Sequence, residues 1–249
     1  MGDRILLALS KPPGPRGERR WQSPAVVRGT ASRSQPPATS GVSDARCVIS
    51  DRHRFICLLI AKNASSTLRA EFRKDLYQAR ELRYAEVDPA ARRDYFTFTY
   101  LRSPVARFLA AYQEISMRFE TEPSPKPKRS FFQMEDSPER FRAFLDAAEV
   151  SLWDEHIRLQ SSFVAGARID FFAMLERFQS DLETIYARIG LGPSPVLPQR
   201  RSREDRKLRY HYDKYLIPES DLDATTLARI TRLLDADIRL VAHRTKHPT

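Results

Sequence analysis

The sequence lacks any apolar run long enough to span a bilayer, which takes about 20 consecutive apolar residues. Its longest apolar stretches are Ile5–Leu9 and Phe55–Ala61. The stretch near the N-terminus is also too short for the hydrophobic core of a secretory signal. We therefore expect no membrane segment in this chain and, by default, a cytoplasmic protein.

Cysteine is also scarce, since Cys47 and Cys57 are the only two in the chain. Neither belongs to a CxxC motif or to a Cys/His pattern with the spacing of metal ligands. The sequence therefore supports neither a disulfide scaffold nor a zinc site, and we expect no metal cofactor.

The composition is that of one soluble globular domain preceded by a tail. The chain has 249 residues, of which 41% are hydrophobic and 30% are charged, which is ordinary for a folded protein. Residues 1–44 are rich in Pro, Ser, Gly and Arg and predict a disordered basic tail. Residues 45–249 predict a single α/β domain.

The charge predicts an anionic partner. The formal net charge is +10, with a sequence pI near 9.8, and such a surface attracts phosphates, acidic glycans or nucleic acid. A basic nucleic-acid-binding or polyanion-binding protein is therefore an alternative. No helix-turn-helix, RNP-like or zinc-finger pattern accompanies it, so we expect no nucleic-acid partner.

Two strand–loop–helix units follow one another along the chain. In the first, the continuous apolar run Phe55–Ile60 is typical of a strand buried on both faces, and apolar residues recur at helical spacing over residues 68–80. In the second, residues 95–101 form a strand and Pro104 begins a helix. Later segments predict a short helix over residues 139–148, a strand over residues 169–174, and two more helices over residues 176–189 and 223–241. This alternation predicts a P-loop-like α/β domain with a central, mainly parallel sheet flanked by helices.

The loop of the first unit, Lys62–Thr67, is a candidate anion site. A loop between a buried strand and a helix N-terminus presents backbone N–H groups and the positive end of the helix dipole, and Lys62 adds a full charge. The three hydroxyl residues can donate to anion oxygens, and we expect one of them to cap the helix: Ser65, Ser66 and Thr67. The loop contains no glycine and its lysine comes first, which disfavours a nucleotide triphosphatase with a Walker A motif.

The segment Ala61–Leu68, Ala-Lys-Asn-Ala-Ser-Ser-Thr-Leu, resembles the 5′-phosphosulfate loop of Golgi-type carbohydrate sulfotransferases (sulfotransferase family 2). That pattern is Pro-Lys-x-Ala-(Gly/Ser)-(Ser/Thr)-(Ser/Thr), so Ala61 replaces its proline. Thr99–Tyr112 resembles the 3′-phosphate segment of the same family. There Arg102, Arg107 and Pro104 match, but Ala110 stands where the family has a serine.

Three further segments resemble the family in the same order. Asp154–Gln160 partly matches Asp-x-His-Trp-x-Pro-Gln, Ile169–Leu182 follows a run ending in Glu and Asp-Leu, and Asp235–Leu240 is similar to the C-terminal helix. The resemblance therefore extends from about residue 45 to residue 243. It implies transfer of a sulfuryl group from 3′-phosphoadenylyl sulfate (PAPS) to a hydroxyl, with no metal.

The resemblance also implies roles for individual residues. Lys62 would be catalytic, as the stabiliser of the leaving group. The residues implied to bind the donor are Lys62, Asn63, Ala64, Ser65, Ser66, Thr67, Arg102, Ser103, Arg206 and Lys207. A guanidinium grips phosphate bidentately, which suits Arg102 to the 3′-phosphate, whereas Arg107 is expected to be structural or to support the residues that bind the phosphate. Ser103 is a possible substitute for the missing serine.

An acceptor hydroxyl needs a base, and the matched segment makes His156 the first candidate, with Glu71 and Glu86 as alternatives. A basic segment near residue 206 is either a loop that closes over the nucleotide or a solvated connector; its basic residues are Arg203, Arg206, Lys207 and Arg209. In the first interpretation, Tyr210 and Tyr212 stack on adenine.

Several questions stay open at this stage. The acceptor is expected to be a carbohydrate, but a small hydroxylated metabolite is also compatible. The changes at Ala61 and Ala110 leave room for a sulfotransferase fold that binds nucleotide poorly. The Golgi lumen is the alternative compartment if an anchor lies outside this chain, and the sequence gives no oligomeric state.

Overall fold

The computed structural model describes residues 44–121, 130–197 and 214–246. A five-stranded sheet organises these residues, in the order β3-β1-β2-β4-β5. Its strands are β1 (Arg46–Ser50), β2 (Phe55–Leu59), β3 (Ala79–Arg83), β4 (Phe96–Leu101) and β5 (Phe171–Met174). Neighbours β2, β4 and β5 run parallel, whereas β1 is antiparallel to both β2 and β3. Four of the five strands thus point the same way, which confirms the mainly parallel sheet.

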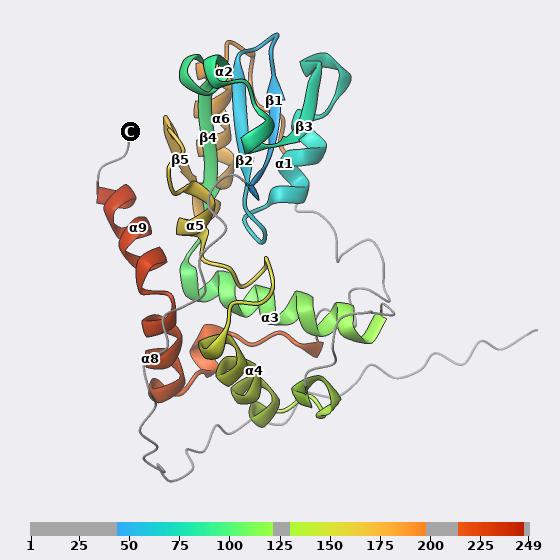
Figure 1. The fold of residues 1–249 in the computed structure, drawn as a ribbon, viewed down its shortest axis with the longest axis vertical. Helices are drawn as coiled ribbons and strands as arrows, with labels where there is room; N and C mark the ends of the chain where they lie inside the picture. Colours follow the sequence, from blue (N-terminus) through green and yellow to red (C-terminus); the bar gives the residue numbers. More distant parts are fainter. Residues whose placement is uncertain (1–43, 122–129, 198–213, 247–249) are drawn as a thin grey trace, which may run out of the picture.

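Helices cover both faces of the sheet (Figure 1). On one face, α1 (Ser65–Phe72) and α6 (Phe178–Arg188) pack over a core that includes Phe55, Phe98 and Tyr186. On the other face, α2 (Pro89–Asp94), α5 (Gln160–Val164) and α9 (Asp235–Lys246) supply Ala91, Phe163 and Leu240. The alternating residues of β2 enter opposite cores, as expected for a strand buried on both sides.

A third hydrophobic cluster lies beyond one end of the sheet (Figure 1). It joins α3 (Pro104–Thr121), α4 (Pro138–Val150) and α8 (Ala224–Leu233) through Phe108, Phe144 and Ile230, which are at most 1% exposed. The long helix α3 begins directly after β4. This cluster therefore anchors the helix that closes the carboxyl end of the sheet.

The elements differ from expectation in three places. The helix expected over residues 68–80 ends at Phe72, and Leu76 lies 52% exposed in a 3₁₀ turn while Tyr77 fills the core. Gln78, with φ of 48°, then turns the chain into β3. Strands β1 and β3 were not predicted; β3 is an edge strand whose residues are mostly charged, so it has little apolar pattern.

The third difference concerns the C-terminal helix expected over residues 223–241. It is two helices, α8 and α9, which meet at the buried Leu234. The expected tail lies outside the described residues except at its last position, so the domain boundary stays a prediction.

Candidate functional site

The site begins where β2 and β4 end. Because these strands are parallel neighbours, the loops that follow them lie side by side at one edge of the sheet, where ligands of open α/β sheets usually bind. One loop is Ala61–Ala64, before α1, and the other is Arg102–Ser103, before α3. Arg102 Nη1 donates to the Lys62 carbonyl oxygen at 3.3 Å, so the two predicted donor loops do meet.

The backbone of the first loop turns sharply without glycine. Lys62 has φ of 68° and Ala64 has φ of 59°, a conformation that costs a residue with a Cβ roughly 1–3 kcal/mol. Among the described residues, no acceptor is found for the backbone N–H groups of Ala64, Ser65 or Ser66. These N–H groups lie at the positive end of α1 and can bind an anion.

The expectation that a hydroxyl residue caps α1 is wrong. The N-cap is Ala64, which has no side-chain hydrogen bond, and the three hydroxyl residues form the first turn of the helix. Their side chains are half-buried, and they make no hydrogen bond within the described part of the chain: Ser65, Ser66 and Thr67. The left-handed turn at Ala64 makes this residue the N-cap, so the helix begins at Ser65 and all three hydroxyls remain available to a ligand.

Lys62 points its ammonium group towards helix α3. Its Nζ lies 3.2 Å from Glu114 Oε2, and Arg118 Nε lies 2.7 Å from Glu114 Oε1. Burial lowers the pKa of Lys62 below its ordinary value of 10.5, and the Glu114 carboxylate partly opposes this effect. Burial disfavours the charge of Glu114, but Lys62 and Arg118 outweigh it and lower the pKa of Glu114. Lys62 thus shares an acidic partner with Arg118.

A carboxylate binds the backbone of the second loop, and an arginine of the helix that follows binds the first loop. The backbone N–H of Ser103 donates to Glu176 Oε1 at 2.8 Å, so a carboxylate occupies the start of α3. Ala110, in place of the family serine, is 7% exposed. Arg107 is 1% exposed and donates from Nε to the Ala61 carbonyl oxygen at 3.1 Å. This bond joins α3 to the Lys62 loop, and burial lowers the pKa of Arg107 to about 10.

The side chain of Asn63 points inward instead of lining the loop surface. It is 1% exposed, and Nδ2 donates to the Tyr100 carbonyl oxygen at 2.7 Å and to Gln160 Oε1 at 2.8 Å. Its Oδ1 is buried and has no partner among the described residues. Asn63 therefore fixes the loop to β4 through its side chain.

His156 forms a dyad with Asp154. The distance from His156 Nδ1 to Asp154 Oδ1 is 2.6 Å, and the side chains are 9% and 12% exposed. A carboxylate on Nδ1 fixes the orientation of the ring and leaves Nε2 to act as a base. A positive charge on His156 lowers the pKa of Glu114, so the dyad lies within electrostatic range of the carboxylate that pairs with Lys62.

The two alternative bases lie elsewhere. Glu71 is 3% exposed and binds the hydroxyls of Tyr77 and Tyr186 at 2.9 and 2.8 Å, inside the core under α1. Glu86 accepts from the backbone N–H of Arg83 at 2.9 Å, just after the edge strand β3, which β1 separates from β2. Neither carboxylate adjoins the Lys62 loop, so His156 stays the candidate base.

The basic loop expected to close over the nucleotide falls outside the described residues. This applies to Arg206 and Lys207, and equally to the associated candidates Arg203, Arg209, Tyr210 and Tyr212. Their roles stay predictions.

Sequence reasoning did not single out Glu114. A helical signal was present, because Glu114 and Arg118 follow Arg107 at seven and eleven residues, on one face of α3. Gln160 and Asp237 lie in segments that resemble the family, but no role was predicted for either residue. Their contacts join residues far apart in the chain, and no local pattern predicts such contacts.

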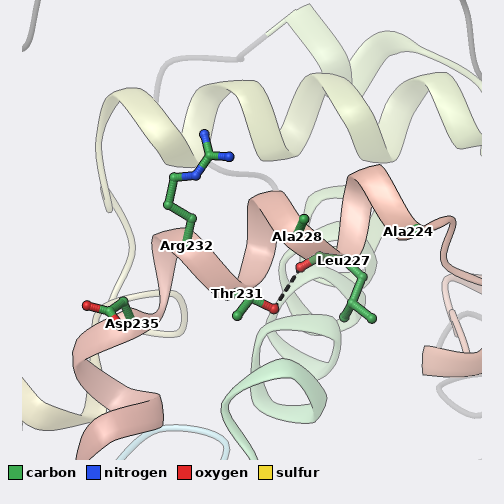
Figure 2. Close-up of a pocket in the computed structure, with 6 residues that line it drawn as sticks. All are labelled: Ala224, Leu227, Ala228, Thr231, Arg232 and Asp235. Carbon is green, nitrogen blue, oxygen red and sulfur yellow. Dashed lines mark hydrogen bonds between the residues drawn. The ribbon is translucent and has the colours of Figure 1, made fainter.

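A shallow hollow of about 590 Å³ lies along α8, away from both loops (Figure 2). It is lined by Ala224, Leu227, Ala228, Thr231, Arg232 and Asp235. Figure 2 shows Thr231 Oγ1 donating to the Leu227 carbonyl oxygen, at 2.8 Å. The lining is mostly small or apolar, so we do not assign the chemistry to this hollow.

Two absences apply to residues 44–121, 130–197 and 214–246. Within these ranges, no helix has the length and apolar character needed to cross a membrane. The same ranges contain no group of three or more His, Cys, Asp or Glu side chains that could hold a metal ion.

Comparison with known proteins agrees with the geometry of the two loops. No curated protein and no solved structure matches the chain significantly. A sequence model of the sulfotransferase family matches residues 42–242, which include both strand–loop–helix units, the His156 dyad and most of α9. The chain therefore belongs to sulfotransferase family 2.

Proposed function

We propose that this chain transfers a sulfuryl group from 3′-phosphoadenylyl sulfate to a hydroxyl group of a carbohydrate. The observation that carries the proposal is the meeting of the two loops, in which Arg102 Nη1 lies 3.3 Å from the Lys62 carbonyl oxygen. A bisphosphorylated nucleotide carries anionic groups at two ends, and each loop offers one end a cation. Family membership supports sulfuryl transfer in general.

The residues of the first loop fit a phosphosulfate group. The N–H groups of Ala64, Ser65 and Ser66 have no acceptor among the described residues, and three half-buried hydroxyls lie beside them. An anion would satisfy these donors while interacting with the positive end of α1. The fit therefore depends on backbone and side chains together.

The bound donor would supply a sulfuryl group and leave as adenosine 3′,5′-bisphosphate. Lys62 would neutralise the negative charge that develops on the leaving phosphate, much as cations do in phosphoryl transfer. In the structure Lys62 is paired with Glu114. The leaving phosphate would thus compete with Glu114 for the ammonium group.

His156 would take the proton from the acceptor hydroxyl through Nε2 while Asp154 holds Nδ1 at 2.6 Å. The Asp154 carboxylate stabilises the imidazolium that forms, as in other His–Asp dyads. Arg102 would grip the 3′-phosphate from the end of β4. The carbohydrate acceptor is supported by the family resemblance of the loops and suits the net charge of +10.

Isothermal titration with adenosine 3′,5′-bisphosphate tests the proposal. We expect the native chain to bind, and Lys62→Ala and Arg102→Ala each to weaken binding about 10-fold or more, because a hydrogen bond to a charged group contributes about 1.5–3 kcal/mol. Arg93→Ala is the matched control, since it removes one exposed positive charge at the end of α2, before β4 begins. No binding by the native chain, or salt-sensitive binding to DNA or RNA alone, would refute the proposal.

A further inference from the structure

We propose that Gln160 is a positioning residue that locks the two donor loops at a fixed separation, and that Asp237 holds Gln160 in place. This inference rests on the proposed function, because it concerns how one nucleotide contacts both loops. Gln160 begins α5, and Asp237 lies in the first turn of α9. Both side chains are fully buried, at 0% exposure.

The amide group of Gln160 connects both loops at once. Its Oε1 accepts from Asn63 Nδ2 at 2.8 Å, on the Lys62 loop, and from the backbone N–H of Arg102 at 3.2 Å. Its Nε2 donates to the Arg102 carbonyl oxygen at 2.8 Å. One planar side chain therefore fixes Asn63 and the backbone of Arg102 relative to each other.

Asp237 fixes the base of this side chain. Its two carboxylate oxygens accept from the backbone N–H groups of Gln160 and Ser161, both at 2.8 Å. A buried carboxylate with two backbone donors and the attraction of Arg107 is fully engaged. The C-terminal helix α9 thereby sets the position of Gln160, although it contributes no residue to either loop.

A fixed separation between the loops should change the affinity of a ligand that contacts both loops more than that of a ligand that contacts one. A nucleotide that contacts one loop gains little from a fixed separation between the loops. A nucleotide with phosphates at both ends gains more, because the second contact forms without further ordering of the protein. Loosening the connection should therefore weaken bisphosphate binding selectively.

A purely structural role predicts a different result. If Gln160 only satisfies buried polar groups of the backbone, its removal lowers stability and weakens all nucleotides to the same degree. The ratio of affinities for bisphosphate and monophosphates separates the two roles, since a uniform loss leaves that ratio unchanged.

The experiment measures dissociation constants of the full chain for adenosine 3′,5′-bisphosphate, adenosine 5′-monophosphate and adenosine 3′-monophosphate. The variants are Gln160→Met, which removes every hydrogen bond of the amide, and Gln160→Glu, which keeps the acceptor and loses the donor to Arg102. Gln179→Met is the matched control, because the amide of Gln179 bonds to Ser194 on another part of the fold, at 2.9 Å.

We expect Gln160→Met to weaken the bisphosphate about 10-fold and each monophosphate less than about 3-fold, with Gln160→Glu intermediate and the control unchanged. If Gln160→Met does not fold, Gln160→Glu tests the inference, and it should show a larger loss of affinity for the bisphosphate than for either monophosphate. Equal losses for all three nucleotides, or an unchanged bisphosphate affinity, would overturn the inference alone. Failure of the native chain to bind the bisphosphate would overturn the proposed function, and the inference with it.

Discussion

The two loops at the carboxyl end of the sheet differ in how many hydrogen-bond donors they leave for a ligand. The loop at Lys62 turns through two positive φ angles, at Lys62 and Ala64, and its N–H groups at the start of α1 find no acceptor among the described residues. At the start of α3, by contrast, the N–H of Ser103 already donates to Glu176. Similar strand–loop–helix units therefore offer different environments to an anion.

This difference indicates a division of roles. The Lys62 loop combines backbone donors, hydroxyls and a buried ammonium, which suits the group whose charge changes during the reaction. The Arg102 loop presents a guanidinium, while its Ser103 N–H is already bound to Glu176, which suits recognition of a phosphate that does not react. We expect variants in the first loop to affect catalysis as well as nucleotide affinity, and variants in the second loop to affect nucleotide affinity with little effect on catalysis.

The largest expected effect comes from replacing each of the two cations, Lys62 and Arg102, with alanine. Lys62→Ala should lower kcat by about 10² to 10³, because it removes the charge that stabilises the leaving phosphate. Arg102→Ala should instead raise KM for the donor about 10-fold with kcat nearly unchanged. Steady-state kinetics of both variants, with Arg93→Ala as control, check this contrast. Equal falls in kcat in both variants would contradict the proposed division of roles between the two loops.

The next effect concerns the dyad of His156 and Asp154. His156→Gln should lower kcat about 10²-fold with little change in donor affinity, since general base catalysis contributes about that much. Asp154→Asn should lower kcat by at least as much, about 10²-fold or more, because an amide on Nδ1 favours the tautomer whose proton lies on Nε2, which then cannot act as a base. Kinetics combined with titration of the bisphosphate measure both quantities. A variant at His156 that retains full kcat would assign the base elsewhere.

A pH effect should be confined to the Lys62 loop. Bound phosphate favours charged Lys62, so affinity should fall as the pH rises through the pKa of Lys62, which burial places below 10.5. Glu114→Gln removes the carboxylate that raises this pKa, so the fall should begin at a lower pH, and binding at pH 7 should be a few-fold tighter. Bisphosphate titrations between pH 7 and 10.5 test this.

Lys62→Arg is the control for that pH series, because a guanidinium stays charged over the whole range. Its affinity should therefore be nearly constant. An identical pH dependence in the native chain and in Glu114→Gln would show that Glu114 does not govern Lys62.

The smallest expected effect lies at Ala110, on the Arg102 side. Ala110→Ser restores the family serine at a position that is 7% exposed on α3. One added hydrogen bond to the 3′-phosphate should tighten bisphosphate binding about 2- to 5-fold and leave 5′-monophosphate binding unchanged. Titration of both nucleotides checks it. Tighter binding of the monophosphate as well would place the hydroxyl near the other end of the nucleotide.

The sequence was sufficient to predict the mainly parallel sheet and the position of Lys62 and Arg102 at the ends of two strands, because a buried strand such as β2 has a strong local apolar pattern. The sequence pattern gave a wrong helix end at Leu76, because apolar residues keep helical spacing past Phe72, where α1 ends. It could not reveal Gln160 and Asp237, since their bonds span 58 and 77 residues of sequence. Contacts of this kind depend on tertiary structure alone.

The most direct test of the division between the loops compares two nucleotides in two variants. Dissociation constants are measured for adenosine 3′,5′-bisphosphate and adenosine 5′-monophosphate. We predict that Lys62→Ala weakens both nucleotides, whereas Arg102→Ala weakens only the bisphosphate, because only that ligand carries a 3′-phosphate. Selective loss of the monophosphate in Arg102→Ala, or unchanged binding of both nucleotides in Lys62→Ala, would contradict the account.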